Sequence, residues 1–114
     1  MKIQIINSIG AVVFVLLGIV GFFFPDLIAQ FVGIIAGKDR GKSEIRATYG
    51  GVFLGIGVSA LYFQDTNVFT AVGIGWALAA VARILGILID KEYHKLNFGG
   101  VIFETTVAIL LLWR

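Results

Sequence analysis

The chain has 114 residues, of which 59% are hydrophobic and 14% are charged, and its formal net charge is +2. A soluble domain carries about a quarter charged residues, so this composition predicts a membrane protein, and the length allows one domain, residues 1–114. The lack of cysteine excludes disulfides and thiolate metal sites, and the single histidine excludes a histidine-rich metal site. The small, scattered charge does not indicate a nucleic-acid partner.

Four apolar stretches are long enough to cross a membrane, at about residues 3–24, 43–63, 68–90 and 97–113. A span of ~30 Å of hydrocarbon needs about 20 apolar residues, and the last stretch, with roughly 17, is at the lower limit. Pro25 ends the first stretch. The apolar residues within 26–36 recur at helical spacing but are too few to cross, which predicts an interfacial or re-entrant helix. The sequence therefore predicts an all-α integral membrane four-helix bundle with one short additional helix between its first two spans.

Short polar segments separate the predicted spans. A basic loop at residues 37–42 precedes Ser43, a side chain suited to N-cap the second span, and polar segments follow at 64–67 and 91–95. With four spans, the loops on one side of the membrane hold five lysines and arginines, whereas the termini and the 64–67 turn hold two. By the positive-inside rule, both termini are predicted to face away from the cytoplasm.

Two charged residues, Arg83 and Glu104, fall inside apolar stretches. Arg83 precedes Asp90 by seven residues, and Glu104 follows Asn97 by seven. At ~1.5 Å per helical residue, both side chains are predicted to lie about 10 Å inside the membrane, measured from its cytoplasmic side. A charge at such a depth costs at least a few kcal/mol unless it is paired, so we predict an ion pair between Arg83 and Glu104.

Arg46 and Tyr49 begin the second predicted span, and Tyr49 is expected roughly 9 Å inside the membrane. We predict that Arg46 and Asp90 extend the network of charges and that Tyr49 donates its hydroxyl. Two other interpretations stay open: a buried ion pair can serve only to fix helix register, and Arg46 can reach the phosphate level with its long side chain. The predicted ligand-binding set is Arg46, Tyr49, Arg83, Asp90 and Glu104.

Glycines recur within the predicted spans. Gly51 and Gly55 form a GxxxG spacing, and Gly73 with Ala77 forms a similar pair of small residues. Small residues let membrane helices approach closely, so helix packing is the predicted role of Gly50, Gly51, Gly55, Gly73 and Gly86. A phosphate-binding loop is not expected, because no Gly-Lys-Ser/Thr follows at the required spacing, and no other motif indicates a cofactor.

The polar motifs of the chain resemble those of a known family. They are E-x-R-A-x-Y-G-G at residues 44–51, R-x-x-G-x-x-x-D at residues 83–90, and Glu104. With these motifs the chain resembles, over its whole length, a family of small bacterial four-helix membrane proteins described as domain of unknown function 4345 and grouped with DoxX-like proteins. The resemblance implies a bundle in the bacterial inner membrane and no established activity. The wider group includes subunits of quinone-linked redox systems, but likeness of fold alone does not carry function.

Three classes of function fit these patterns. The leading hypothesis is a protein in the lipid bilayer that binds an amphipathic or anionic small molecule, such as a lipid head group or quinone-like compound, near the cytoplasmic leaflet. The second is a structural subunit that packs against copies of itself or within a larger membrane complex. The third, a membrane enzyme or a proton-coupled transporter using Glu104, is disfavoured, because the sequence shows neither a nucleophile–base set nor broken helices.

Overall fold

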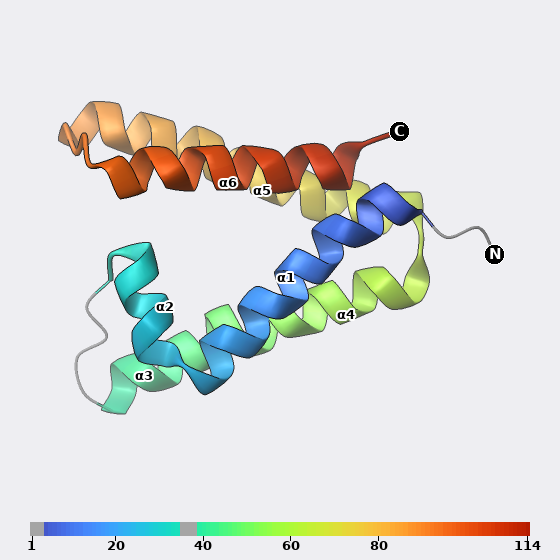
Figure 1. The fold of residues 1–114 in the computed structure, drawn as a ribbon, viewed down its shortest axis with the longest axis horizontal. Helices are drawn as coiled ribbons and strands as arrows, with labels where there is room; N and C mark the ends of the chain where they lie inside the picture. Colours follow the sequence, from blue (N-terminus) through green and yellow to red (C-terminus); the bar gives the residue numbers. More distant parts are fainter. Residues whose placement is uncertain (1–3, 35–38) are drawn as a thin grey trace. The chain divides into compact units, whose positions relative to one another are not determined.

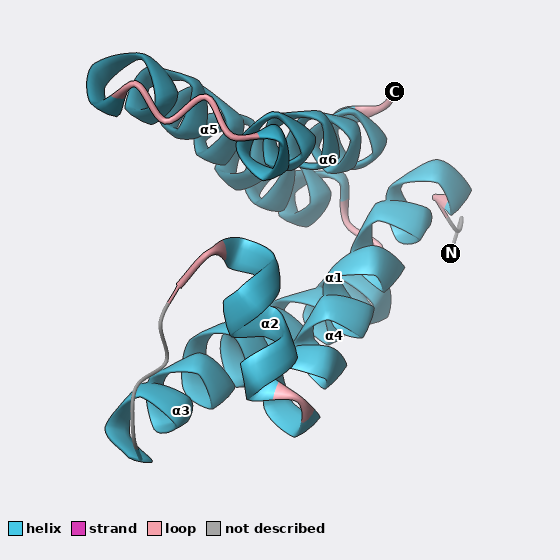
Figure 2. Ribbon diagram, turned by 60° about the vertical axis from the view of Figure 1, so that its left-hand side comes forward, coloured by secondary structure: helices cyan, strands magenta, loops and turns pink. Residues whose placement is uncertain are grey.

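The computed structural model describes residues 4–34 and 39–114, and the elements in these ranges are helices joined by short loops (Figure 1). Figure 2 shows the same helices coloured by secondary structure. The predicted all-α class is therefore confirmed. In chain order, the elements are α1 (Ile5–Phe23), α2 (Pro25–Val32), α3 (Asp39–Ile45), the π-helix η1 (Arg46–Val52), α4 (Phe53–Phe63), α5 (Thr66–Asp90) and α6 (Lys95–Leu112).

Three of these helices, α1, α5 and α6, are long and apolar enough to cross a membrane. They match the predicted spans at 3–24, 68–90 and 97–113, with bounds that differ by one or two residues, and position 3 lies outside the described residues. The predicted span at 43–63 is helical throughout but is divided among α3, η1 and the 11-residue α4. A bundle of four spans stays a prediction.

The segment between α1 and the next predicted span differs from the sequence-based interpretation. The expected helix at 26–36 ends at Val32, because Gly33 adopts a left-handed backbone with a φ of 75°. Residues 35 and 36, with positions 37 and 38 of the predicted basic loop, lie outside the described residues. The remainder of that loop is wrong as a prediction, since α3 begins at Asp39 and encloses Ser43, which therefore does not N-cap the following helix.

Two contacts explain why this charged stretch is helical. The Nζ of Lys42 lies 3.5 Å from a carboxylate oxygen of Asp26 at the start of α2. Ile45, at the end of α3, is buried together with Ile28 and Ala29 of α2 in one apolar cluster. Packing against α2 thus offsets the weak intrinsic helix preference of the sequence, because tertiary contacts supply most helical stability in proteins.

The chain divides into two compact units. The first unit comprises Met1–Gly10 and Gln64–Arg114, the second unit comprises Ala11–Phe63, and the division falls within α1. Each unit has its own set of contacts.

In the second unit, α1 packs beside α4 and η1 at the level of the backbone (Figures 1 and 2). A Cβ added at Gly57 would lie 2.6 Å from a methyl carbon of Val15, and one at Gly18 would lie 2.5 Å from the backbone nitrogen of Leu54. A Cβ at Gly50 would lie 2.9 Å from the Cα of Phe22. These positions have room for glycine alone, which is the close packing that small residues permit between membrane helices.

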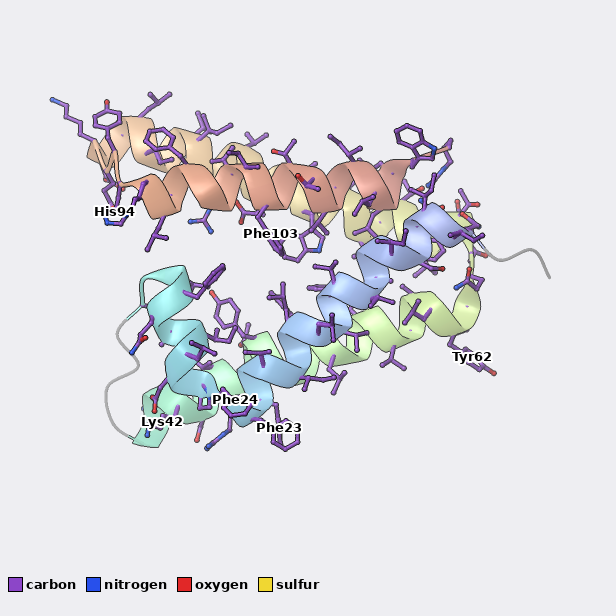
Figure 3. All side chains as sticks on the ribbon, in the orientation of Figure 1. Phe23, Phe24, Lys42, Tyr62, His94 and Phe103 are labelled. Atoms are coloured by element: carbon purple, nitrogen blue, oxygen red, sulfur yellow. The ribbon has the colours of Figure 1, made fainter. Side chains whose placement is uncertain are left out.

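In the first unit, α5 and α6 form a helical hairpin. Lys91 ends α5 in a left-handed conformation with a φ of 55°, and the Nδ1 of His94 accepts a hydrogen bond from the backbone N–H of Leu96 at 3.1 Å. His94, which lies at this turn in Figure 3, is therefore the N-cap of α6. This cap starts α6 at Lys95, two residues before the predicted start at Asn97.

We predict that the adjacent glycines Gly50 and Gly51 respond differently to substitution by alanine. Gly50→Ala should destabilise the protein by about 1–3 kcal/mol, because its methyl group would lie 2.9 Å from the backbone nitrogen and Cα of Phe22, which cannot move aside as a flexible side chain can. Gly51→Ala is the matched control, since the nearest atom to its Cβ is the Arg46 carbonyl oxygen at 3.8 Å. Thermal unfolding in detergent measures both changes, and equal midpoints for the two variants would contradict the packing of η1 on α1.

Candidate functional site

The predicted ion pair between Arg83 of α5 and Glu104 of α6 is confirmed. The Nε of Arg83 donates to Oε1 of Glu104 at 2.7 Å, and its Nη2 donates to Oε2 at 3.2 Å. The pair is therefore bidentate, the geometry in which a guanidinium and a carboxylate interact most strongly and with the most defined orientation.

Two further residues of α6 contact the Arg83 side chain. The Nη1 of Arg83 donates to Oδ1 of Asn97 at 3.4 Å. A Cβ added at Gly100 would lie 2.8 Å from Nε and 2.9 Å from Cζ of Arg83, so the arginine lies directly over this glycine. Asn97, Gly100 and Glu104 follow each other at intervals of three and four residues, which places them on one face of α6.

The two partners differ in exposure. The Glu104 side chain is 10% exposed, whereas that of Arg83 is 30% exposed. Glu104 follows the start of α6 by nine residues, so it lies about 14 Å from that end, deeper than the sequence predicted, because α6 begins before Asn97. The site thus pairs a buried carboxylate with the guanidinium of a partly exposed arginine side chain.

The other predicted ligand-binding residues have surroundings of their own. Asp90 is exposed in the last turn of α5, while Glu104 supplies the carboxylate that contacts Arg83. Arg46 and Tyr49 belong to the second unit. Arg46 is exposed, and its Nε donates to the carbonyl oxygen of Phe22 at 3.1 Å near the end of α1. This contact satisfies one of the carbonyls that a helix end leaves unpaired.

The ring of Tyr49 is half-buried in the second unit. It packs against the cluster formed by Ile28, Ala29 and Ile45, and it lies edge-on to Phe53 with ring centroids 5.4 Å apart. The apolar part of Tyr49 therefore joins α2 and α3 to the following helix.

The π-helix η1 carries both Arg46 and Tyr49, and sequence reasoning missed it. Short π-helical segments within α-helices are frequent at functional sites. The pair Gly50–Gly51 is the one local signal for it, because consecutive glycines let a backbone depart from α-helical geometry. The spacing of apolar residues could not reveal the π-helix, because an apolar stretch has the same hydropathy in an α-helix and in a π-helix.

Sequence reasoning also missed a second buried polar residue, Asn7. The side chain is buried in the first unit, and its Nδ2 donates to the carbonyl oxygens of Leu110, Leu111 and Trp113 at 2.9, 3.0 and 3.1 Å. These are carbonyls at the end of α6, which have no partner within the helix. A polar residue in an apolar stretch was the available signal, but its partner could not be named from the sequence.

The glycines predicted to pack helices fall into two groups, those whose added Cβ would lie against a neighbouring helix and those with open surroundings. Gly50 faces Phe22, and a Cβ at Gly73 would lie 2.7 Å from Leu112. Nothing lies within 4 Å of a Cβ built at Gly55 or Gly86, and Gly51 has one neighbour, at 3.8 Å.

The described residues define a helical protein with three helices long and apolar enough to cross a membrane, and with an ion pair joining two of them. A model of a protein family matches residues 3–114. Because this match covers almost the whole chain, the chain belongs to that family, which is described as a domain of unknown function, DUF4345. No curated protein and no solved structure matches it.

We predict that Gly100→Leu separates Arg83 from Glu104, because the new side chain would occupy the space of the guanidinium. A carboxylate buried without its partner is costly, so the variant should be destabilised by roughly 3 kcal/mol or more. Gly99→Leu is the control, since nothing lies within 4 Å of its Cβ. Thermal unfolding in detergent measures the difference in stability. A Gly100→Leu variant as stable as the control would refute the packing of Arg83 on Gly100.

We predict that Asn7→Ala lowers stability by about 1–3 kcal/mol, because it removes the side-chain donor to the Leu110 carbonyl and one of the two side-chain donors to the Leu111 carbonyl, which Arg114 also contacts. Asn7→Asp should lower stability more, since an ionised carboxylate has no N–H to donate and would face three carbonyl oxygens. Hydrogen exchange of the last turn of α6 measures the local effect. If protection there were the same in both variants as in the parent chain, Asn7 would not be the cap.

Proposed function

We propose that this protein crosses the membrane four times and binds an amphipathic or anionic small molecule, such as a lipid head group or a quinone-like compound, at Arg83 and Glu104. The observation that supports this is the unequal exposure of the pair, since the Glu104 side chain is 10% exposed and the Arg83 side chain 30%. In this proposal the site lies toward the cytoplasmic leaflet, and both termini face away from the cytoplasm.

The position of the pair gives it a role that a surface salt bridge lacks. Arg83 lies seven residues, or about 10 Å, from the end of α5, so in a spanning helix it would be within the hydrocarbon layer. Charged side chains at that depth are expensive and commonly mark ligand or ion pathways. Glu104 fixes the guanidinium plane through two hydrogen bonds, so Arg83 can present its N–H groups to a ligand oxygen in a defined direction.

Asn97 adds a neutral group to the proposed site. Its Oδ1 lies 3.4 Å from Nη1 of Arg83, and its Nδ2 donates to the carbonyl oxygen of Glu92 at 3.0 Å. The amide is therefore held by the turn before α6. The contributions of Arg46, Tyr49 and Asp90 to ligand binding stay predictions.

A second candidate function is a structural subunit, in a homo-oligomer or a larger membrane complex, with an ion pair that only fixes the register of α5 and α6. The open surroundings of Gly51 and Gly55 favour it, because two small residues four apart on one helix can admit a second helix closely. In this case Arg83 would need the Glu104 carboxylate as its partner but would bind no ligand.

An exchange of charges separates the two functions. We predict that Arg83→Leu abolishes binding, and that the double variant Arg83→Glu with Glu104→Arg recovers stability without recovering binding, because the pair re-forms with the guanidinium on the other helix. Native mass spectrometry of protein released gently from its own membrane detects a retained molecule, and thermal unfolding measures stability. A retained molecule in the parent chain that is lost in both variants supports the binding function.

Two outcomes would contradict binding at Arg83. If the parent chain has a mass without any bound molecule, and the charge-exchanged variant is fully stable, the ion pair would serve only to fix the register of α5 and α6. A molecule that stays bound in Arg83→Leu at full occupancy would place the ligand away from this arginine.

A further inference from the structure

The turn between α5 and α6 holds a titratable side chain in a structural role. His94, the single histidine of the chain, is exposed and is the N-cap of α6. Its Nδ1 accepts a hydrogen bond from the backbone N–H of Leu96 at 3.1 Å. The residues that usually N-cap a helix are asparagine, aspartate, serine and threonine, and histidine differs from them because its side chain gains a proton between about pH 8 and pH 5. The start of α6 therefore depends on a group whose charge changes near neutral pH.

The hydrogen bond between His94 and Leu96 requires a neutral imidazole. The Nδ1 can accept only while it carries no proton, so the neutral ring must hold its proton on Nε2. A protonated imidazole carries an N–H at both nitrogens, and its Nδ1–H would then face the N–H of Leu96. The positive charge would also lie at the N-terminus of α6, where the helix dipole disfavours a cation. Protonation thus removes the cap and replaces an attraction by a repulsion.

The charged groups around His94 do not provide a partner for a protonated ring. The titratable side chains of the turn and of the helix ends beside it are all exposed, and they are Asp90, Lys91, Glu92, Tyr93 and Lys95. Two carboxylates and two ammonium groups among them oppose each other, and the phenol ionises only in alkaline solution. His94 forms an ion pair with none of the residues that the structure describes. The loss of the hydrogen bond therefore decides the direction of the effect.

The first turn of α6 connects His94 to the ion pair of Arg83. The backbone carbonyl oxygen of His94 accepts hydrogen bonds from the N–H groups of Asn97 at 2.9 Å and Phe98 at 3.3 Å. The Nδ2 of Asn97 donates to the carbonyl oxygen of Glu92 at 3.0 Å, and its Oδ1 accepts from Nη1 of Arg83 at 3.4 Å. The order of this turn therefore fixes the position of the amide that contacts Arg83.

We infer that His94 makes the start of α6 sensitive to pH. At pH 8 the neutral imidazole caps α6 and keeps Asn97 beside Arg83. As the pH falls toward 5 and the imidazole gains a proton, the cap is lost, the first turn of α6 frays, and Asn97 separates from Arg83. The stabilisation by the cap is thus present at the higher pH and lost on acidification. This inference concerns the turn itself and does not depend on the ligand proposed at Arg83.

Exchange of the Leu96 and Asn97 amide protons with water tests the inference. NMR of the protein in detergent micelles measures the rates at pH 8 and pH 5, and each rate is divided by that of the same amide in His94→Ala at the same pH. This ratio removes the intrinsic dependence of exchange on pH. At pH 8 the parent chain should exchange about threefold or more slowly than His94→Ala, because an N-cap stabilises the start of a helix by at least that factor. At pH 5 the two rates should be equal.

The matched control is His94→Asn, at the same exposed position. Asparagine is a favourable N-cap and does not titrate, so this variant should exchange about threefold or more slowly than His94→Ala at both pH values. Protection that is the same at pH 8 and pH 5 in the parent chain would overturn the inference. The same dependence on pH in His94→Asn would also overturn it, because the effect would then arise from another group, such as Asp90 or Glu92.

The connection to Arg83 has a readout of its own. Between pH 8 and pH 5, the side-chain amide signals of Asn97 and the guanidinium signals of Arg83 should shift in the parent chain and stay unchanged in His94→Asn. Guanidinium signals that do not move while Leu96 loses its protection would show that the cap titrates without reaching the ion pair, and this would overturn the last step of the inference.

Discussion

The ion pair between Arg83 and Glu104 constrains how α5 and α6 pack in the first unit. A carboxylate that is 10% exposed needs a cation in a fixed place, and the bidentate geometry leaves little freedom in the distance between α5 and α6. The guanidinium then requires space on α6, which Gly100 provides. The register of the hairpin and the glycine at position 100 thus both serve one electrostatic requirement.

The second unit depends on a different constraint, which is the approach of two backbones. Gly18 and Gly57 lie where a Cβ would overlap the opposite helix, and Gly50 does the same from η1. In water such contacts would be supplemented by burial of large side chains, but here many large apolar side chains are exposed, among them Phe23 and Phe24 (Figure 3). Exposure on this scale is what a helix surface in lipid requires, because lipid tails do not drive apolar side chains into a core.

Sequence reasoning succeeded where the physical requirement was strong and local. Uninterrupted apolar length identified α1, α5 and α6, and the cost of an unpaired charge in hydrocarbon identified the partner of Arg83. It failed where the outcome depends on weak effects that oppose each other, such as intrinsic helix preference and packing against a neighbouring helix. A charged stretch became α3 because Ile45 packs against α2, and the departure of η1 from α-helical geometry leaves no trace in hydropathy. The caps supplied by His94 and Asn7 depend on which carbonyl or N–H lies nearby, and this is known only from the fold.

The charge balance of the pair narrows the range of ligands proposed for Arg83. Arg83 and Glu104 together carry no net charge, so an anion added to the intact pair would leave one negative charge uncompensated within the hydrocarbon layer. A carbonyl or hydroxyl oxygen accepts the same hydrogen bonds without this penalty. Among the ligands proposed for this pair, a neutral amphipathic molecule that offers the carbonyl of a quinone or ester would therefore fit the intact pair better than one that offers a phosphate.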